Sequence, residues 1–318
     1  MNTPARLGLY TLGLAVAFAG AFGAGRLAGP EPAQREAHQA VMNHADAISG
    51  DEANPASSPR GLQVSDAGYR LVPVVSSLPV GTVTDFRFRI LGEHGQPVTD
   101  FTPTHEKNLH LIVVRRDLSG YQHLHPTMAS DGTWTIPLTV ASAGQYRIFA
   151  DFQPTGRASA LTLGVDLAAA GTYLPQPLPV PKPAVQVDGY EVELSGGLVP
   201  GTASRLTLTV TRGGVPVTDL QPYLGAYGHL VALRDGDLAY RHVHPADGGR
   251  TTAGPQLTFY VEVPSDAAYR LYLDFQHNGK VRTAEFTVVA GSVPTGVTSP
   301  PPAQPGPTGH ADQPHGHG

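Results

Sequence analysis

Cysteine is absent from the 318 residues of this chain, and its absence excludes several kinds of site. The chain cannot form disulfide bonds, thiolate metal sites or the His2Cys centre of a blue-copper electron carrier, and no N-terminal cysteine can be lipidated. Charged residues make up only 15% of the chain, and the net charge of -5 gives no electrostatic basis for binding nucleic acid. GxSxG, HExxH, phosphate-binding glycine loops and nucleotide fingerprints are also missing, so we expect that the protein is not an enzyme.

Glycine and proline, by contrast, are abundant, with 37 and 30 residues. They separate short stretches in which apolar and polar residues alternate, a pattern that is typical of an all-β protein. A chain of this length is sufficient for two ordinary domains, each with its own core.

A stretch that begins with histidine occurs twice, as HLIVVRRDLSGYQHLHP from His110 and as HLVALRDGDLAYRHVHP from His229. The flanks repeat as well: GQPVTDFTP and GVPVTDLQP precede the two copies, and YRIFADFQ and YRLYLDFQ follow them. The segments SAGQY and SDAAY resemble the tyrosine corner of immunoglobulin-like domains. We therefore predict one module used twice, as tandem immunoglobulin-like β-sandwich domains at residues 61–171 and 185–291.

The N-terminal part, residues 1–29, contains an uncharged run at 7–25 that indicates either a cleaved signal sequence or a retained membrane anchor. Residues 30–60 are expected to form a short helix and a flexible spacer. One positive charge precedes the run and no second run follows it. We therefore expect the rest of the chain at the extracytoplasmic face of the cell envelope, or secreted if the run is cleaved.

Two further segments are rich in proline. Residues 172–184 carry proline at alternate positions, which predicts an extended polyproline II linker that holds the two domains at a set distance. Residues 292–318 form a Pro/Gly/His tail with few apolar residues, and we expect it to be disordered.

Each repeated stretch predicts a β-hairpin that carries three histidines. Residues two apart on a strand share a face, so His123 lies beside His125 in the first copy. If the register pairs His110 with either of these residues, all three imidazoles converge, whereas a shift by one residue separates them. Three neutral imidazoles suit Cu²⁺ or Zn²⁺. The predicted metal ligands are His110, His123, His125, His229, His242 and His244.

Additional ligands, or hydrogen-bond partners that orient the histidines, are expected among His105, Glu106, Met128, Asp151, Asp274 and His277. The thioether of Met128 would favour copper. Asp151 and Asp274 occupy matching places in the two repeats and are suited to fix the tautomer of a histidine. The alternative interpretation is structural: the histidines close the hairpins and stack on Tyr121 or Tyr240.

These motifs resemble those of poorly characterised bacterial envelope proteins that have one N-terminal span, tandem immunoglobulin-like or cupredoxin-like domains and HLHP segments. That group is associated with copper and heavy-metal handling. We accordingly expect an extracytoplasmic protein that binds a transition metal, copper or alternatively zinc, for trafficking, buffering or tolerance. Its expected partners are the metal ion, the membrane if the N-terminal helix is retained, and a metal transporter or envelope protein. The alternative is a metal-free tandem adhesion or scaffolding protein.

Overall fold

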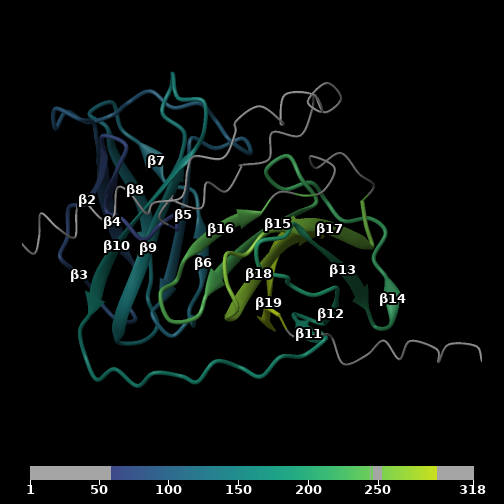
Figure 1. Cartoon of the computed structure of the whole chain (residues 1–318). Coiled ribbons are helices and arrows are strands. Elements are labelled where there is room, and N and C mark those ends of the chain that lie inside the picture. Colours follow the sequence, from purple (N-terminus) through teal and green to yellow (C-terminus); the bar gives the residue numbers. More distant parts are fainter. Residues whose placement is uncertain (1–58, 244, 246–252, 292–318) are drawn as a thin grey trace, which may run out of the picture. The chain divides into compact units, whose positions relative to one another are not determined.

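The computed structural model describes residues 59–243, 245 and 253–291, and these residues form two β-sandwich modules (Figure 1). The predictions for residues 1–58, for His244 and for the tail from residue 292 lie outside the described part. Within the described ranges no helix has the length and apolar character needed to cross a bilayer. The prediction of an all-β protein with two tandem sandwiches is confirmed.

Module 1 consists of two five-stranded sheets that enclose a core. In spatial order, the first sheet contains β1 (Ser65–Asp66), β2 (Tyr69–Pro73), β4 (Thr84–Leu91), β8 (Thr133–Leu138) and β7 (Thr127–Met128). The second contains β3 (Ser77–Leu78), β10 (Leu161–Ala169), β9 (Gly144–Phe152), β5 (Leu109–Arg115) and β6 (Gln122–Leu124). Neighbouring strands are antiparallel, except that β3 runs parallel to β10.

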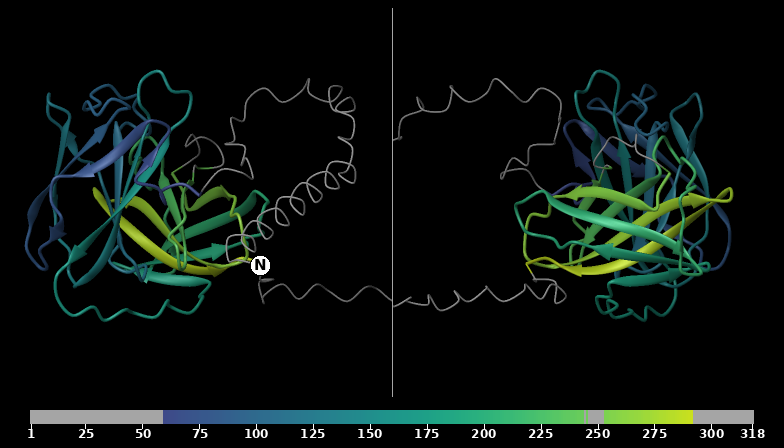
Figure 2. Two further views of the ribbon diagram at one scale, coloured as in Figure 1. Left: turned by 60° about the vertical axis from the view of Figure 1, so that its left-hand side comes forward. Right: turned by 90° about the vertical axis from the view of Figure 1, so that its right-hand side faces the viewer.

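Module 2 has the same arrangement with slightly different edges. One sheet contains β11 (Ala184–Val187), β12 (Tyr190–Ser195), β13 (Ser204–Arg212) and β14 (Val215–Pro216), and β17 (Gln256–Val261) also pairs with β13. The other contains β16 (Tyr240–Val243), β15 (Gly228–Arg234), β18 (Ala268–His277) and β19 (Lys280–Val289). Figure 2 shows the strands of both modules from two further sides.

Alternation along the strands forms each core. On β4, Phe86, Phe88 and Ile90 are fully buried between the sheets, while the residues between them point outward. The tyrosine corner is present in both modules, which confirms the resemblance seen in the sequence. The hydroxyl of Tyr146 donates a hydrogen bond to the Ser142 carbonyl (2.8 Å), and that of Tyr269 donates to the Ser265 carbonyl (3.1 Å).

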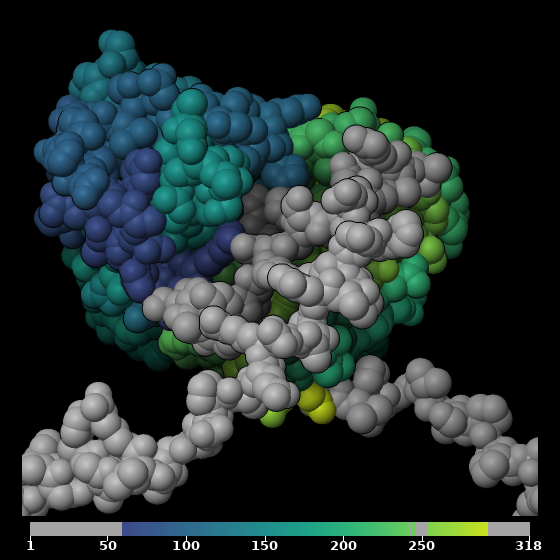
Figure 3. Space-filling model, turned by 45° about the horizontal axis from the view of Figure 1, so that its top comes forward, coloured from purple at the N-terminus to yellow at the C-terminus, as the bar shows by residue number. Residues whose placement is uncertain are grey.

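Strands β5 and β15 are buried on both faces, which explains why their sequences do not alternate. Leu111 and Val113 point into the core of module 1, whereas Ile112 and Val114 point outward into a third apolar cluster. This interface cluster consists of Ile112, Val114, Leu118, Phe149, Val231, Leu233, Leu238, Tyr240 and Tyr272, with Tyr121 and Leu178 packed against it. Because it contains residues of both repeats, the two modules dock directly on each other, and their surfaces meet in Figure 3.

The interface relates equivalent residues of the two repeats in a reciprocal way. Tyr121 stacks on Tyr272 with ring centroids 3.8 Å apart, and Phe149 lies against Tyr240 at 5.1 Å. Tyr121 and Tyr240 occupy the same place in the repeat, as do Phe149 and Tyr272. Such reciprocal contact is the pattern of an isologous dimer interface, here formed within one chain.

The proline-rich linker lies against module 1. The Gln176 amide donates a hydrogen bond to Asp117 Oδ2 (2.8 Å), Arg115 Nη2 donates to the Leu174 carbonyl (3.4 Å), and Leu178 packs on the interface cluster. Between β10 and β11 the chain is extended and forms no strand (Figure 1). The sequence predicts a linker that sets the distance between the domains, but the docked interface itself brings them into contact.

Candidate metal centre

Three histidines of the β5–β6 hairpin meet beside the interface cluster. The register pairs Ile112 with His123 and Leu111 with Leu124, so His110 lies opposite His125, one residue beyond the end of β6. His110, Ile112 and Val114 therefore share the outer face of β5 with His123 and His125. This is one of the two registers under which the sequence predicts convergence.

The ring nitrogens of these histidines converge closely. His110 Nδ1 lies 3.0 Å from His123 Nε2 and 3.2 Å from His125 Nε2. The three ligand atoms all lie within 4.8 Å of one another, and His110 is fully buried. Among the residues described, this is the group of three His or carboxylate side chains with the spacing of a metal site.

The opposite nitrogens of the same rings are held by acceptors. His110 Nε2 lies 3.0 Å from the Thr104 carbonyl oxygen, and His123 Nδ1 lies 2.8 Å from Asp274 Oδ2. A carbonyl or a carboxylate oxygen only accepts, so both of these outer nitrogens carry hydrogen. In a neutral imidazole the other nitrogen then presents a lone pair. The lone pairs of His110 Nδ1 and His123 Nε2 thus face each other, with the two nitrogens 3.0 Å apart. Such an arrangement requires a proton or a metal cation between the nitrogens.

The third ring, His125, is contacted by module 2. Its Nδ1 lies 3.4 Å from the hydroxyl of Tyr223. Burial raises the pKa of Tyr223 to about 12, and the nearby Asp274 carboxylate adds to the increase. Tyr223 is consequently a neutral phenol at physiological pH.

Asp274 comes from the second repeat but holds a histidine of the first. Its side chain is 3% exposed, as is that of His123. The second carboxylate oxygen, Oδ1, accepts a hydrogen bond of 2.6 Å from the Thr283 hydroxyl on β19. Asp274 lies across the β15–β18 ladder from His229 and across the β18–β19 ladder from Thr283, so the register of module 2 positions the carboxylate.

Two further histidines lie next to the three. His229 Nε2 donates to the Tyr223 carbonyl (2.7 Å), the repeat-equivalent of the bond from His110 to Thr104. His105 lies edge-on to His229 with ring centroids 5.2 Å apart, and 6.1 Å from His110. The ring of His229 is 6.4 Å from that of His123. Histidines of both repeats therefore gather at one place.

The sequence also predicts Asp151, Glu106 and His242 as ligands or as residues that orient the ligands. Asp151 lies across the ladder from His110 and accepts hydrogen bonds from the hydroxyls of Tyr240 and Thr162, both at 3.3 Å. Glu106 is exposed, in a loop beside Gly225 of module 2. The backbone of His242 pairs with Val231 on β15, as that of His123 pairs with Ile112, but its side chain lies outside the description.

Two predicted ligands are not brought to the histidines. Met128 lies on β7 in the other sheet of module 1 and packs against the core there, because the chain crosses between sheets after the HxHP segment. His277, at the end of β18, bonds with the Tyr190 hydroxyl (2.7 Å) and with Asp219 Oδ1 (3.1 Å). Since it lies three residues beyond Asp274, it points to the opposite face of the strand.

The sequence does not predict the roles of the Thr104 carbonyl and of Tyr223, or the contact of Asp274 with the other module. One signal was available for the first two, because Thr104 and Tyr223 both stand six residues before the opening histidine of their repeat. No signal in the sequence pairs Asp274 with His123, since the two residues are 151 positions apart.

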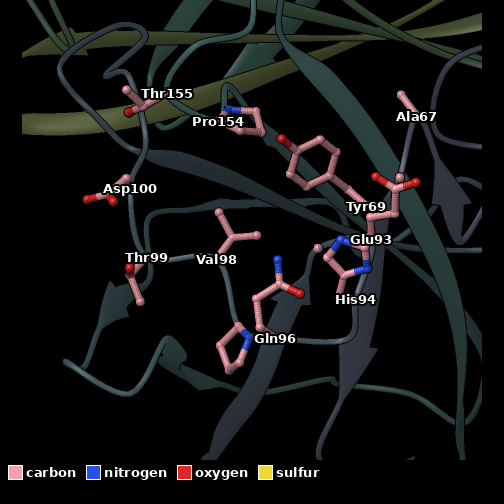
Figure 4. A pocket seen from close by; sticks show the side chains of 13 residues that line it. Ala67, Tyr69, Glu93, His94, Gln96, Val98, Thr99, Asp100, Pro154 and Thr155 are labelled. Atoms are coloured by element: carbon pink, nitrogen blue, oxygen red, sulfur yellow. The ribbon is translucent and has the colours of Figure 1, made fainter.

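An open pocket on module 1 is lined by Tyr69, Glu93, His94 and Asp100, among others. Figure 4 shows Glu93 and His94 beside Tyr69 on one side, with Asp100 and Thr155 on the other. The titratable side chains do not point to a common centre, so this pocket has no constellation comparable to the three histidines.

No curated protein matches the chain. Similar solved structures include the BSP domain of a biofilm-associated protein (12% identity, 71% of this chain and 30% of that chain, TM-score 0.20) and bovine butyrophilin (10%, 70% and 99%, 0.21). The FN1–FN3 domains of chicken CNTN1 are also similar (10%, 67% and 68%, 0.18). The chain thus spans about 30% of the biofilm-associated structure. The strand order and the cores remain the basis for the fold assignment.

One family model matches the chain twice, at residues 63–169 and 185–292, and its description is a domain of unknown function, DUF8832. The two matches coincide with the two β-sandwich modules and together span more than half of the sequence. The chain therefore belongs to the DUF8832 family and contains two copies of its domain in tandem.

Proposed function

We propose that this protein binds a transition-metal ion through His110, His123 and His125. The observation that supports the proposal is the pair of facing lone pairs: His110 Nδ1 and His123 Nε2 are 3.0 Å apart while their outer nitrogens donate to Thr104 and Asp274. A cation between the two nitrogens removes their repulsion and uses both lone pairs.

The spacing suits copper, which is the metal that we propose, and also zinc, which is the alternative. Metal–imidazole bonds are about 2.0–2.1 Å long, so nitrogens 3.0 and 3.2 Å apart subtend about 95–105° at the metal. Tetragonal Cu²⁺ prefers angles near 90°, whereas tetrahedral Zn²⁺ needs nitrogens about 3.3 Å apart. The angles lie between these two preferences, so the spacing is compatible with either metal.

The biological role that we propose is trafficking, buffering or tolerance of that metal outside the cytoplasm. The apolar run at residues 7–25 supports the location, and the absence of catalytic motifs supports binding without catalysis. We propose copper as the metal and the N-terminal run as a membrane anchor. The proposed partner is a metal transporter or another envelope protein.

A second candidate function is metal-free scaffolding or adhesion. It is favoured by the direct docking of two immunoglobulin-like modules around a buried cluster. In that case a proton replaces the metal, because 3.0 Å is also an ordinary N–H···N distance, and the Asp274 carboxylate balances the resulting imidazolium. The histidines then close the hairpin and hold the modules together.

Calorimetric titration with Cu²⁺ and Zn²⁺ tests the two candidates. The protein for this experiment ends at residue 291, so that the histidines of the tail do not contribute. His123→Ala/His125→Ala is expected to remove one tight binding equivalent, whereas His94→Ala, which removes an exposed histidine of the same module, leaves the stoichiometry unchanged. Unchanged stoichiometry in the double variant would contradict the metal site. Lower stability of that variant with no response to metal would support the scaffold.

A further inference from the structure

We infer that the metal site is assembled by the docking of the two repeats, so that metal binding and docking strengthen each other. This inference rests on the proposed function and adds Asp274, from the second repeat, as a positioning residue for a ligand in the first. The three ligating histidines all belong to module 1, yet module 2 supplies groups that orient them.

The strongest link is the hydrogen bond from His123 Nδ1 to Asp274 Oδ2. It is 2.8 Å long, both side chains are 3% exposed, and the Thr283 hydroxyl holds the other carboxylate oxygen at 2.6 Å. A carboxylate in this position selects the tautomer with hydrogen on Nδ1, which turns the lone pair of Nε2 toward His110. It also makes the imidazole a stronger donor to a metal.

A second link runs through Tyr223 of module 2, which contacts His125 of module 1 and His229 of its own module. Its hydroxyl lies 3.4 Å from His125 Nδ1, and its carbonyl accepts from His229. The hydroxyl of a tyrosine can donate to or accept from a ring nitrogen, so this contact orients the His125 ring from module 2. The ring of His105, from module 1, lies 5.2 Å from that of His229.

These polar contacts adjoin the apolar interface cluster, so they form and break together with it. Tyr121, two residues before His123, stacks on Tyr272, two residues before Asp274. Separation of the modules would therefore break the apolar contact and the Asp274 contact together, and His123 would lose the group that selects its tautomer. A metal that binds the docked state more tightly must stabilise docking by the same factor.

Zinc titration of the full-length chain measures the contribution of Asp274, since zinc undergoes no redox change during the experiment. Asp274→Asn is expected to weaken tight zinc binding about tenfold to hundredfold. Asp219→Asn is the control. Like Asp274, Asp219 is a carboxylate of module 2 that accepts a hydrogen bond from a histidine, but its partner is His277, away from the site. Thr283→Val, which frees the carboxylate without removing it, should weaken binding in the same direction by a smaller factor.

Hydrogen exchange provides a readout that a merely structural role of Asp274 would not change. Zinc is expected to slow amide exchange in β18 and β19 of module 2 as well as in the β5–β6 hairpin, and Asp274→Asn should abolish only the effect in module 2. Zinc affinity and module 2 protection that are unchanged in Asp274→Asn would overturn the inference while leaving the metal site intact. Absence of tight zinc and copper binding by the unmodified chain would instead refute the proposed function.

Discussion

The two faces of β15 allow docking to be perturbed separately from folding. Leu233 and Leu230 lie on the same strand and are both fully buried. Leu233 points into the interface cluster, whereas Leu230 points into the core of module 2. Leu233→Ala is therefore expected to weaken the docking of the modules, and Leu230→Ala to weaken the fold of module 2.

The free energy lost in each variant can be estimated from the full burial of Leu233 and Leu230. Leucine-to-alanine substitutions at fully buried positions typically cost about 2–5 kcal/mol, because transfer free energy and packing are both lost. A loss of about 3 kcal/mol in docking corresponds to a weakening of about 150-fold. The same loss for Leu230→Ala lowers the free energy of unfolding of module 2.

The assay uses a protease site inserted at Val180, an exposed linker residue, so that cleavage leaves the modules held together only by their interface. Dissociation of the cleaved halves reports docking, and denaturant unfolding monitored in module 2 reports its stability. Leu233→Ala should raise the dissociation constant about 150-fold with little change in the unfolding of the separated module 2. Leu230→Ala should show the reverse.

Similar behaviour of the two variants would refute the assignment of Leu233 to docking and of Leu230 to folding. Equal loss of module 2 stability in both would mean that Leu233 supports the fold of its own module. Unchanged dissociation in Leu233→Ala would mean that the apolar cluster contributes little to docking. The polar contacts of Asp274 and Tyr223 would then be the main source of the interface.

Two further predictions concern titratable groups. Desolvation raises the pKa of Asp117, but hydrogen bonds from Arg115, the Gln176 amide and Ser119 outweigh it and lower the pKa to about 2. Because the shift is downward, the stabilisation, about 2 kcal/mol, is complete above about pH 4 and lost as the pH falls towards 2, and Asp117→Asn should remove that pH dependence of unfolding. The Tyr223 hydroxyl faces His125 Nδ1, while Nε2 of the same ring faces His110, so Cu²⁺ is expected to bind without a phenolate charge-transfer band; a band that Tyr223→Phe abolishes would contradict this.

Much of the fold could be predicted because it depends on local patterns. Alternation placed Phe86 and Phe88 in a core, and the SAGQY and SDAAY segments indicated the corners at Tyr146 and Tyr269. The unbroken apolar run after His110 is typical of a strand that is buried on both faces, and the structure shows that the second face is buried by the other repeat.

The candidate site was predictable only in part. The hairpin limits the register to a few choices, and the observed register brings His110, His123 and His125 together. Met128 was expected nearby because it follows His125 by three residues, but the chain passes to the other sheet within that interval. Proximity in sequence is a poor guide wherever a sandwich strand changes sheets.

The sequence by itself determined the all-β class, the two modules and the placement of three histidines on one hairpin, because repeats, two-residue periodicity and hairpin closure act over short distances. Only the tertiary structure decided that the outer faces of β5 and β15 dock against each other. That docking brings Asp274 to His123 across 151 positions. The physical reason is that the free energy of docking comes from burying both apolar faces together, and no local pattern states which surfaces will meet.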